Sequence, residues 1–267
     1  FGFGAALPAV AAHAGLLGFS SQKLTWGSAA GVPFDLGVWE GIDGSTLVSA
    51  LNPGAYIGEI GTDLSADSAA CATVAKQGAA SGTFAGVRYF GTGDTGGGPT
   101  EASVQWLERS FHGRGPVRVL SVPADQFARD LSAPGAAGLR ARLPRYCGEL
   151  LMTRHGAGCY TSQAAMKRMN RRNESLADAA ERAAVAAHLL GALPYPREAL
   201  RENQVRFLWH QFHDDLTGTS IPAAYAVSWN DERIAENRFA AILGDAAGGV
   251  TRALDTRARG VPIVVYN

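Results

Sequence analysis

Residues 161–190 read TSQAAMKRMNRRNESLADAAERAAVAAHLL, and this stretch decides how the second part of the chain folds. Apolar side chains recur in it every three or four residues, with arginines and glutamates between them. Such spacing is typical of an amphipathic helix, which buries one stripe and exposes the other. The apolar positions are Met166, Met169, Leu176, Ala180, Ala183, Ala187 and Leu190. We therefore predict one long helix from Thr161 or Ser162 to about Ala192.

Two further helical patterns follow the long one. Pro194 and Pro196 end the first helix, because proline lacks the amide N–H that the helix needs and its ring blocks the preceding turn. A second pattern covers residues 200–212, and a third covers residues 224–243. Short connections imply antiparallel neighbours. We therefore predict a three-helix bundle over residues 146–248.

Residues 1–145 have a different character, with glycine-rich loops between short apolar runs. The runs are residues 14–19, 87–90 and 117–120. Thr100 precedes an apolar pattern that continues to Phe111, which predicts a helix capped by the threonine. Strands that alternate with helices indicate an α/β layer. Residues 132–138, SAPGAAG, are rich in turn-forming residues and predict a linker.

Composition narrows the classes of partner. The 267-residue chain has 24 Lys and Arg against 24 Asp and Glu, so it has no net field to attract nucleic acid, and no apolar run approaches the length of a bilayer span. We expect a neutral small-molecule partner, with neither nucleic acid nor membrane. Cys71, Cys147 and Cys159 lack metal-binding spacing, so we expect buried free thiols. The sequence does not indicate a localisation. Homo-oligomers remain a possible partner state of a full-length protein.

Residues 210–220, HQFHDDLTGTS, are the most chemically suggestive stretch. His210 and His213 are spaced to share a helical face, and His213 lies where that helix must end before a Thr-Gly-Thr turn. A metal site there is one interpretation. Simple capping or packing is the other, and the spacing alone favours it, because two nitrogens are too few for zinc.

Residues 91–100, GTGDTGGGPT, form a second suggestive stretch, and they contain the G-x-G-x-x-G pattern of dinucleotide-binding proteins at Gly91–Gly96. A dinucleotide-binding oxidoreductase is thus an alternative function. Against it, Pro99 and the added glycines delay the helix whose N-terminus would meet a pyrophosphate. Asp94 in such a loop could simply stabilise a glycine turn.

Several segments together resemble glycoside hydrolase family 38, the zinc-dependent α-mannosidases. Gln211-Phe212-His213-Asp214 with Gly218-Thr219-Ser220 is similar to the family signature. Further matches occur in the family's order along the whole chain: FGF at 1–3, LP at 7–8, GF at 18–19, SQKL at 21–24, WEGIDGS at 39–45, GTGDTGGGPT at 91–100, and His155 with CYTS at 159–162, Lys167, Asn170-Arg171 and Glu174. The resemblance implies that His213 binds Zn²⁺ and that Asp214 contacts the mannose hydroxyls.

The resemblance also implies roles for residues outside that signature. Asp94 is the implied general acid/base of a retaining mechanism. The implied substrate-binding residues are Asp43, Phe1, Trp39 and His155. A turn would explain Asp43 equally well, and an aromatic residue in such a setting is more often part of the core.

The fold implied by the resemblance has three parts. Residues 1–145 would be the C-terminal part of an irregular parallel (β/α) barrel, residues 146–248 the bundle, and residues 249–267 the first strand of a downstream β-sandwich. The function implied is a retaining α-mannosidase acting on a mannose-containing oligosaccharide or glycan. In the family, the nucleophile and two more zinc ligands precede the segment matched by Phe1, so we expect the chain alone to be inactive. A non-catalytic carbohydrate-binding relative stays open.

Overall fold

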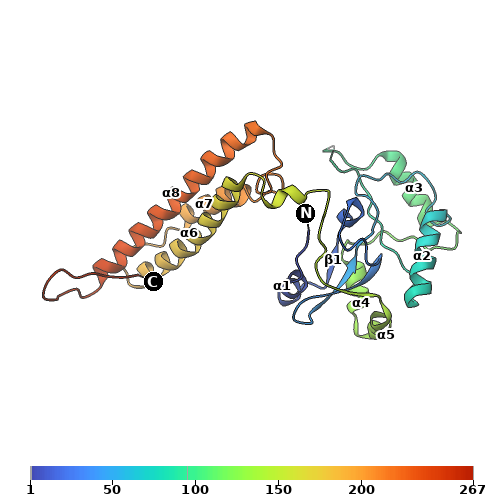
Figure 1. The fold of residues 1–267 in the computed structure, drawn as a ribbon, viewed down its shortest axis with the longest axis horizontal. Coiled ribbons are helices and arrows are strands. Elements are labelled where there is room, and N and C mark those ends of the chain that lie inside the picture. The colour runs from blue at the N-terminus through green and yellow to red at the C-terminus, as the bar shows by residue number, and fades with distance from the viewer. Residues whose placement is uncertain (1, 95, 267) are drawn as a thin grey trace. The chain divides into compact units, whose positions relative to one another are not determined.

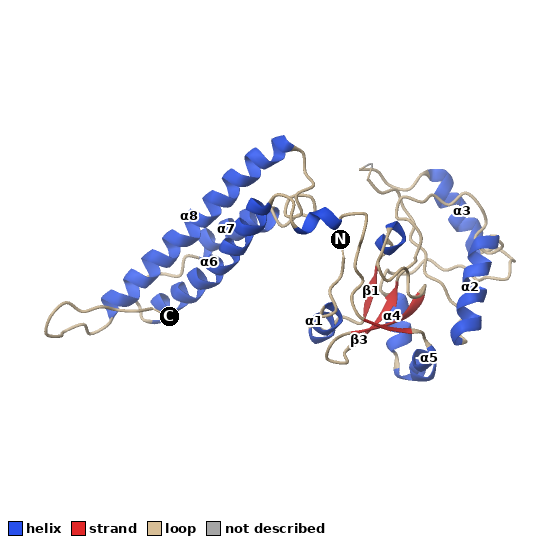
Figure 2. Cartoon of the chain, in the orientation of Figure 1, coloured by secondary structure: helices blue, strands red, loops and turns tan. Residues whose placement is uncertain are grey.

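The computed structural model describes residues 2–94 and 96–266, and the chain divides into two compact units, Phe1–Ala157 and Gly158–Asn267. The first contains a small sheet with helices and long loops, and the second is helical (Figures 1 and 2). None of the described helices combines the length and apolarity that crossing a membrane requires.

The sheet of the first unit has four strands in the order β1-β3-β2-β4. They are β1 (Gly18–Ser20), β2 (Leu36–Glu40), β3 (Thr46–Ala50) and β4 (Arg145–Cys147). Strands β2 and β3 form an antiparallel hairpin in which Val38 pairs with Val48, while β1 runs parallel to β3 and β4 parallel to β2. The sheet is therefore mixed, where a parallel one was expected.

Alternate residues of the hairpin supply two separate cores. Val38 and Val48 pack with Ala128 and Leu131 of helix α4 (Gln126–Ser132). The next residue, Trp39, packs on the other face with residues that include Leu24, Leu150 and Met152. This alternation follows from the two-residue period of a strand, and it explains why the β2 side chains are buried although they do not alternate in polarity.

The expectation of strands at residues 87–90 and 117–120 was wrong, and of residues 14–19 only the last two enter a strand. Tyr89 N–H donates to Pro53 O, and Val117 N–H donates to Ser65 O, so each segment is tied to another loop. An apolar run becomes a strand only when a neighbouring strand lies alongside it, and these runs have no such ladder.

Two helices of the first unit begin at side-chain caps. Helix α3 (Glu101–Phe111) begins as predicted, with Ser103 N–H donating to Thr100 Oγ1, and α2 (Ser68–Ser81) begins where Ala70 N–H donates to Asp67 Oδ1. The linker expected at residues 132–138 was wrong, because Pro134–Ala136 forms a 3₁₀ turn inside the unit. The remaining helices are α1 (Leu7–His13), α5 (Ala137–Arg142) and the 3₁₀ turns Lys23–Trp26 and Ala157–Tyr160.

The second unit contains α6 (Ala164–Leu189), α7 (Arg197–Trp209) and α8 (Pro222–Ala253), which pack along one another. The predicted helices are thus confirmed, although α8 is longer than expected. Small side chains allow α6 and α8 to approach closely. They are Ala180, Ala183, Ala184, Ala187 and Ala246, all buried. Phe207 of α7 packs edge-on against Phe239 of α8 and closes the core.

Two other expectations concern the cysteines and the C-terminal segment. All three cysteines are free, but Cys147 is exposed and Cys71 half-buried, so only Cys159 is the buried thiol expected. Within residues 254–266, no strand is formed, and Val261, Ile263 and Val265 are exposed. The strand expected there therefore stays a prediction.

Candidate functional site

His213 and Asp214 lie on the turn that joins α7 to α8. Helix α7 ends at Trp209, and His210 is its C-cap residue, so the two histidines do not share a helical face as expected. The side chain of His210 is 4% exposed and that of His213 is 67% exposed. Because the chain turns between them, one imidazole enters the interior and the other faces solvent, where it contacts the Phe212 ring.

Asp214 presents its carboxylate beside His213. Asp214 Oδ2 lies 3.5 Å from His213 Nε2, and Asp214 Oδ1 accepts a hydrogen bond from Thr219 Oγ1 at 2.7 Å. The Thr217 hydroxyl donates to the carbonyl of His213. The two threonines of the Thr-Gly-Thr turn therefore hold the backbone of His213 and the carboxylate of Asp214.

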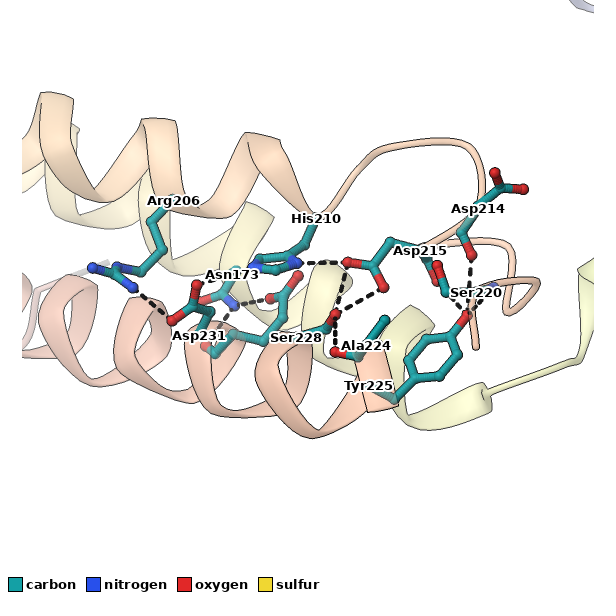
Figure 3. A network of polar contacts seen from close by, with 11 residues as sticks. Asn173, Arg206, His210, Asp214, Asp215, Ser220, Ala224, Tyr225, Ser228 and Asp231 are labelled. Carbon is teal, nitrogen blue, oxygen red and sulfur yellow. Dashed lines mark hydrogen bonds and ion pairs between the residues drawn. The ribbon is translucent and has the colours of Figure 1, made fainter. Parts of the chain in front are cut away.

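Beneath this exposed pair lies a buried polar network, drawn in Figure 3. His210 Nδ1 is 2.6 Å from Asp215 Oδ2, and His210 Nε2 is 3.3 Å from Asp231 Oδ2. Asp231 in turn accepts from Arg206, while both oxygens of Asp215 accept from Ser228 Oγ at 2.9 Å. The packing role that the spacing favoured for His210 agrees with this environment, and the network joins α7, the turn and α8.

Tyr225, near the start of α8, caps the backbone of the turn (Figure 3). Its hydroxyl donates to Asp214 O at 3.0 Å and accepts from Ser220 N–H at 3.1 Å. Asp214 O also accepts from the N–H groups of Thr219 and Ser220, each at 2.9 Å. The carbonyl of the proposed sugar-binding residue is therefore the point on which the turn closes.

The start of the second unit clamps the same turn from α6. Lys167 Nζ donates to Ser162 O and to Leu216 O, and burial lowers the pKa of this lysine. Gly218 has φ +87°, and a Cβ there would lie 2.7 Å from the backbone of Ser162. Glycine is needed at this position for both reasons, because a side chain would be strained and would clash.

Glu232, one turn beyond Ser228 on α8, is fully buried beside the network. Burial raises the pKa of its carboxyl, although the hydrogen bond from Asn173 partly opposes the shift. Glu232 Oε1 and Asn173 Oδ1 lack hydrogen-bond partners. A protonated Glu232 would place a donor among these acceptors, which is consistent with the raised pKa.

Asp94 belongs to a second polar cluster, in the first unit. Tyr56 O–H donates to Asp94 Oδ2 at 2.8 Å, and this hydrogen bond raises the pKa of the tyrosine. Lys23 Nζ lies 3.9 Å from the Trp26 ring centroid and 4.9 Å from that of Tyr56. His155 meets the same Trp26 ring edge-on at 4.4 Å. The fold thus brings Asp94 and His155 to one surface, linked through Tyr56 and Trp26.

The backbone at Asp94 is unusual for a residue with a side chain. Its φ is +62°, in the left-handed region that aspartate tolerates better than most residues. The preceding Gly93 has no room for a side chain, because a Cβ would lie 1.9 Å from the Tyr56 ring. The carboxyl is exposed, so the partial desolvation expected of a general acid is not provided by the described part of this unit.

The remaining predicted site residues fall outside these two groups. Asp43 forms a tight turn, accepting hydrogen bonds from Ser45 N–H and Oγ and approaching His13 Nε2 at 3.1 Å. The bonds from Ser45 lower the pKa of Asp43. Trp39 is fully buried and donates to Gly148 O, so its implied role in substrate binding was wrong: a buried ring has no face free for a sugar. Phe1 lies outside the described residues.

The dinucleotide alternative for Gly91–Gly96 is not supported. That fingerprint requires a strand directly before the loop and a helix that opens at its last glycine. Residues 87–90 form no strand, and α3 begins only at Glu101. No helix N-terminus is therefore available at Gly96 to bind a pyrophosphate.

Within residues 2–94 and 96–266, no three His, Cys, Asp or Glu side chains gather closely enough to hold a metal ion. His213 nevertheless fits as one ligand of a zinc site, because its imidazole is exposed on a braced turn and imidazole nitrogen is a common zinc donor. The other zinc ligands would be residues that do not lie beside His213 in the described part of the chain.

Sequence reasoning missed Tyr56, Tyr225 and Asp215, each of which contacts a candidate residue or its backbone. Asp215 directly follows Asp214, so its position alone could have raised the question of its role. Tyr56 lies 38 residues from Asp94, and such a distance along the chain leaves no local signal.

Two family models match the chain in succession. Residues 1–149 match the N-terminal domain of the glycosyl hydrolases family 38, and residues 156–248 match the alpha mannosidase middle domain. The chain is 31% identical over 240 residues to the alpha-mannosidase of Saccharomyces cerevisiae, covering 84% of this chain and 21% of that protein. It is 32% identical over 223 residues to human alpha-mannosidase 2C1, covering 83% and 20%. The chain thus spans about a fifth of these relatives' length.

The fold also resembles solved structures. An alpha-mannosidase from Enterococcus faecalis V583 superposes with a TM-score of 0.65 at 18% identity, over 96% of this chain and 29% of that one. A second solved structure, of a protein in glycosyl hydrolase family 38 from E. faecalis, gives a TM-score of 0.60 at 16% identity, over 95% of this chain and 26% of that one. At such identities the likeness concerns the mixed α/β fold alone.

Proposed function

The chain belongs to glycosyl hydrolase family 38, and on that premise we propose that the full-length protein is a retaining α-mannosidase. It would hydrolyse terminal α-linked mannose in oligosaccharides or glycans. The observation that carries the proposal is the succession of two matched domains, the second of which contains the turn with His213 and Asp214. Relatives named alpha-mannosidase, which align with most of this chain, support the proposal.

We propose the following division of the chain. Residues 1–145 would form one part of a (β/α) barrel. The other strands of the barrel would come from a part of the full-length protein outside residues 1–267. Residues 146–248 would form a three-helix bundle that presents the turn, and residues 249–267 would begin a β-sandwich. The matched ranges 1–149 and 156–248 support a boundary a few residues later than 145, and residues 146–157 belong to the first compact unit.

In this proposal His213 would help to hold zinc, on which family 38 depends in general. The ion would supply positive charge at the hydroxyls of carbons 2 and 3 of the terminal mannose. Asp214 would accept hydrogen bonds from the same hydroxyls. Thr219 already donates to Asp214 Oδ1, which orients the carboxylate so that Oδ2 remains beside the His213 ring.

Asp94 would act as general acid and then as general base. It would give its proton to the departing oxygen, and later take a proton from the water that releases the sugar. Tyr56 would orient the carboxyl through its hydroxyl. Substrate bound over the cluster would remove the water that surrounds Asp94 here. The nucleophile would come from a part of the full-length protein outside residues 1–267. Its carboxyl would lie about 5–5.5 Å from that of Asp94.

Two further residues keep proposed roles. His155 would line the leaving-group side, since it contacts Trp26 in the cluster that includes Asp94. Asp43 would bind a sugar hydroxyl, and to do so it would give up a hydrogen bond within its own turn.

The test is hydrolysis of an aryl α-mannoside by the full-length protein, before and after a chelator and again after added zinc. We expect activity that the chelator removes and zinc restores, and no activity from residues 1–267 alone. Mannose binding without hydrolysis by the full-length protein would favour the carbohydrate-binding alternative. Robust zinc-dependent hydrolysis by residues 1–267 would contradict the placement of the nucleophile outside this chain.

A further inference from the structure

We propose that Tyr225 and Asp215 are positioning residues, which fix the turn between α7 and α8 so that His213 and Asp214 are presented in one orientation. This inference rests on the proposed function. Neither residue would touch the substrate. Tyr225 would act on the backbone of Asp214, and Asp215 would act by anchoring the turn in the buried network.

The argument begins with the contrast in exposure along the turn. His213 and Asp214 have side chains that are 67% and 44% exposed, whereas the next residue, Asp215, has a side chain that is 10% exposed. An exposed side chain has little packing to hold it, so its direction depends on the backbone that carries it. What determines the position of the pair is therefore the set of contacts made by that backbone.

Tyr225 holds this backbone at Asp214 itself. Its hydroxyl donates to Asp214 O, at 3.0 Å, and accepts from Ser220 N–H, at 3.1 Å, so it bridges the two ends of the turn. The ring is 3% exposed and packs with Met166 and Met169 of α6, which fixes where the hydroxyl can reach. A buried tyrosine needs a partner for its hydroxyl, and here the partner is the carbonyl of a residue proposed to bind sugar.

Asp215 anchors the other side of Asp214. Its carboxylate meets His210 Nδ1 at 2.6 Å and accepts from Ser228 Oγ, so the side chain is tied to both helices that flank the turn. His210 is held in turn by Asp231. A buried carboxylate with these partners cannot move without leaving its charge uncompensated, which makes the anchor stiff.

Together the two anchors constrain the chain on both sides of the pair, since Asp215 ties the turn to His210 before it and Tyr225 joins Asp214 to Ser220 beyond it. Metal ligands depend on outer partners of this kind, whose removal typically weakens metal binding about 10–100-fold. We expect the same order of effect when the hydroxyl of Tyr225 is removed, because the ligand-bearing backbone then loses its cap.

The experiment compares Tyr225→Phe with Tyr195→Phe in the full-length protein. Both variants lose one hydroxyl from the helical unit and keep the ring, but Tyr195 O–H donates to Glu181, away from the turn. We would measure the zinc Kd by competition with a chelator, kcat and KM on an aryl α-mannoside, and hydrogen exchange of the Thr219 and Ser220 amides. For Tyr225→Phe we expect a zinc Kd about 10–100-fold weaker, a lower kcat and faster exchange, with a melting temperature close to that of Tyr195→Phe.

Ser228→Ala tests the second anchor and serves as a further variant if Tyr225→Phe does not fold. It removes the donor to both oxygens of Asp215 and should weaken zinc binding in the same direction. The inference is overturned if Tyr225→Phe, or Ser228→Ala in its place, matches Tyr195→Phe in zinc Kd, kcat and exchange. It is also overturned if the melting temperature alone falls. A wild-type protein without zinc-dependent hydrolysis would instead contradict the proposed function, and the exchange comparison would still test the anchors.

Discussion

Asp94 and Asp214 are both carboxylates on exposed loops, but the chain supports them differently. Asp94 lies in a glycine-rich loop, where the Tyr56 hydroxyl holds its side chain and its own backbone has a positive φ. Asp214 lies on a turn that a buried network, a tyrosine hydroxyl and a lysine hold from three helices. The position of Asp214 is therefore built into the helical unit, whereas Asp94 depends on a local loop conformation and on whatever covers it.

The largest effect that would test this comparison is the loss of His213. In the full-length protein, His213→Ala should lower zinc content and turnover by roughly a thousandfold or more, because the ion loses one protein ligand. The free energy of unfolding of the metal-free protein should change little, since the side chain is mostly exposed. Normal zinc stoichiometry in this variant, measured by atomic absorption, would contradict the assignment of His213 as a zinc ligand.

His210→Ala is the matched control, and its effects should be the reverse. Removing this buried ring takes one partner from each of Asp215 and Asp231 and should cost about 3 kcal/mol in unfolding free energy. Its effect on zinc binding should be about 10–100-fold, because Asp215 loses an anchor while His213 stays, and so should be smaller than that of His213→Ala. If both variants lost zinc equally, the two histidines would have to be regarded as ligands together.

The next effect concerns the loop that holds Asp94. Asp94→Asn should slow hydrolysis of alkyl mannosides by about 10²–10⁴, since a poor leaving group needs the proton, while the first step on an activated aryl mannoside is spared. Tyr56→Phe keeps the carboxyl and should reduce both rates only a few-fold. Equal losses on the two substrates in Asp94→Asn would indicate that the residue holds the loop and is not the acid.

A smaller effect tests how closely the turn is packed. Gly218→Ala introduces a Cβ at φ +87° that would also lie 2.7 Å from Ser162, so it should cost about 2–3 kcal/mol in denaturant unfolding. Gly191→Ala is the control, because its φ of +67° imposes similar strain with no atom within 4 Å, and it should cost about 1 kcal/mol. Equal costs would mean that the turn yields readily to Ser162.

The smallest effect concerns the buried carboxyl beneath the turn. Burial raises the pKa of Glu232 above 4.5, so the folded state holds this proton more tightly than the unfolded chain does. Its contribution to stability is therefore present below pH 4.5 and is lost as the pH rises through the folded-state pKa. Glu232→Gln cannot ionise, and its amide could donate to Asn173 Oδ1. We expect a higher denaturation midpoint than wild type at pH 7 and little difference at acidic pH.

Glu236→Gln provides the opposite sign on the same helix. Glu236 pairs with Arg172 and Arg233, so removing its charge should lower the midpoint at pH 7. A lower midpoint for Glu232→Gln as well would show that the buried carboxyl contributes as an ion, contrary to the direction of its pKa shift.

The sequence was most informative where structure depends on near neighbours. Helix α6 repeats its apolar residues every three or four positions, and α3 begins at a threonine cap, so each could be recognised within a few residues. The strands could not be recognised in this way, because β4 pairs with β2 more than a hundred residues away. The runs at 87–90 and 117–120 are also apolar, but they form no strand because no neighbouring strand pairs with them. Trp39 was misassigned for the same reason, since burial depends on distant residues.

By itself the sequence determined the three long helices, the capped α3, the family and the presence of His213 and Asp214 on a turn. Only the tertiary structure decided that His210 and Asp215 are buried while His213 is exposed, and that Tyr56 and Tyr225 hold the two loops. The physical reason is that helical periodicity and caps are local, whereas burial and side-chain pairing arise when segments far apart in the chain pack together.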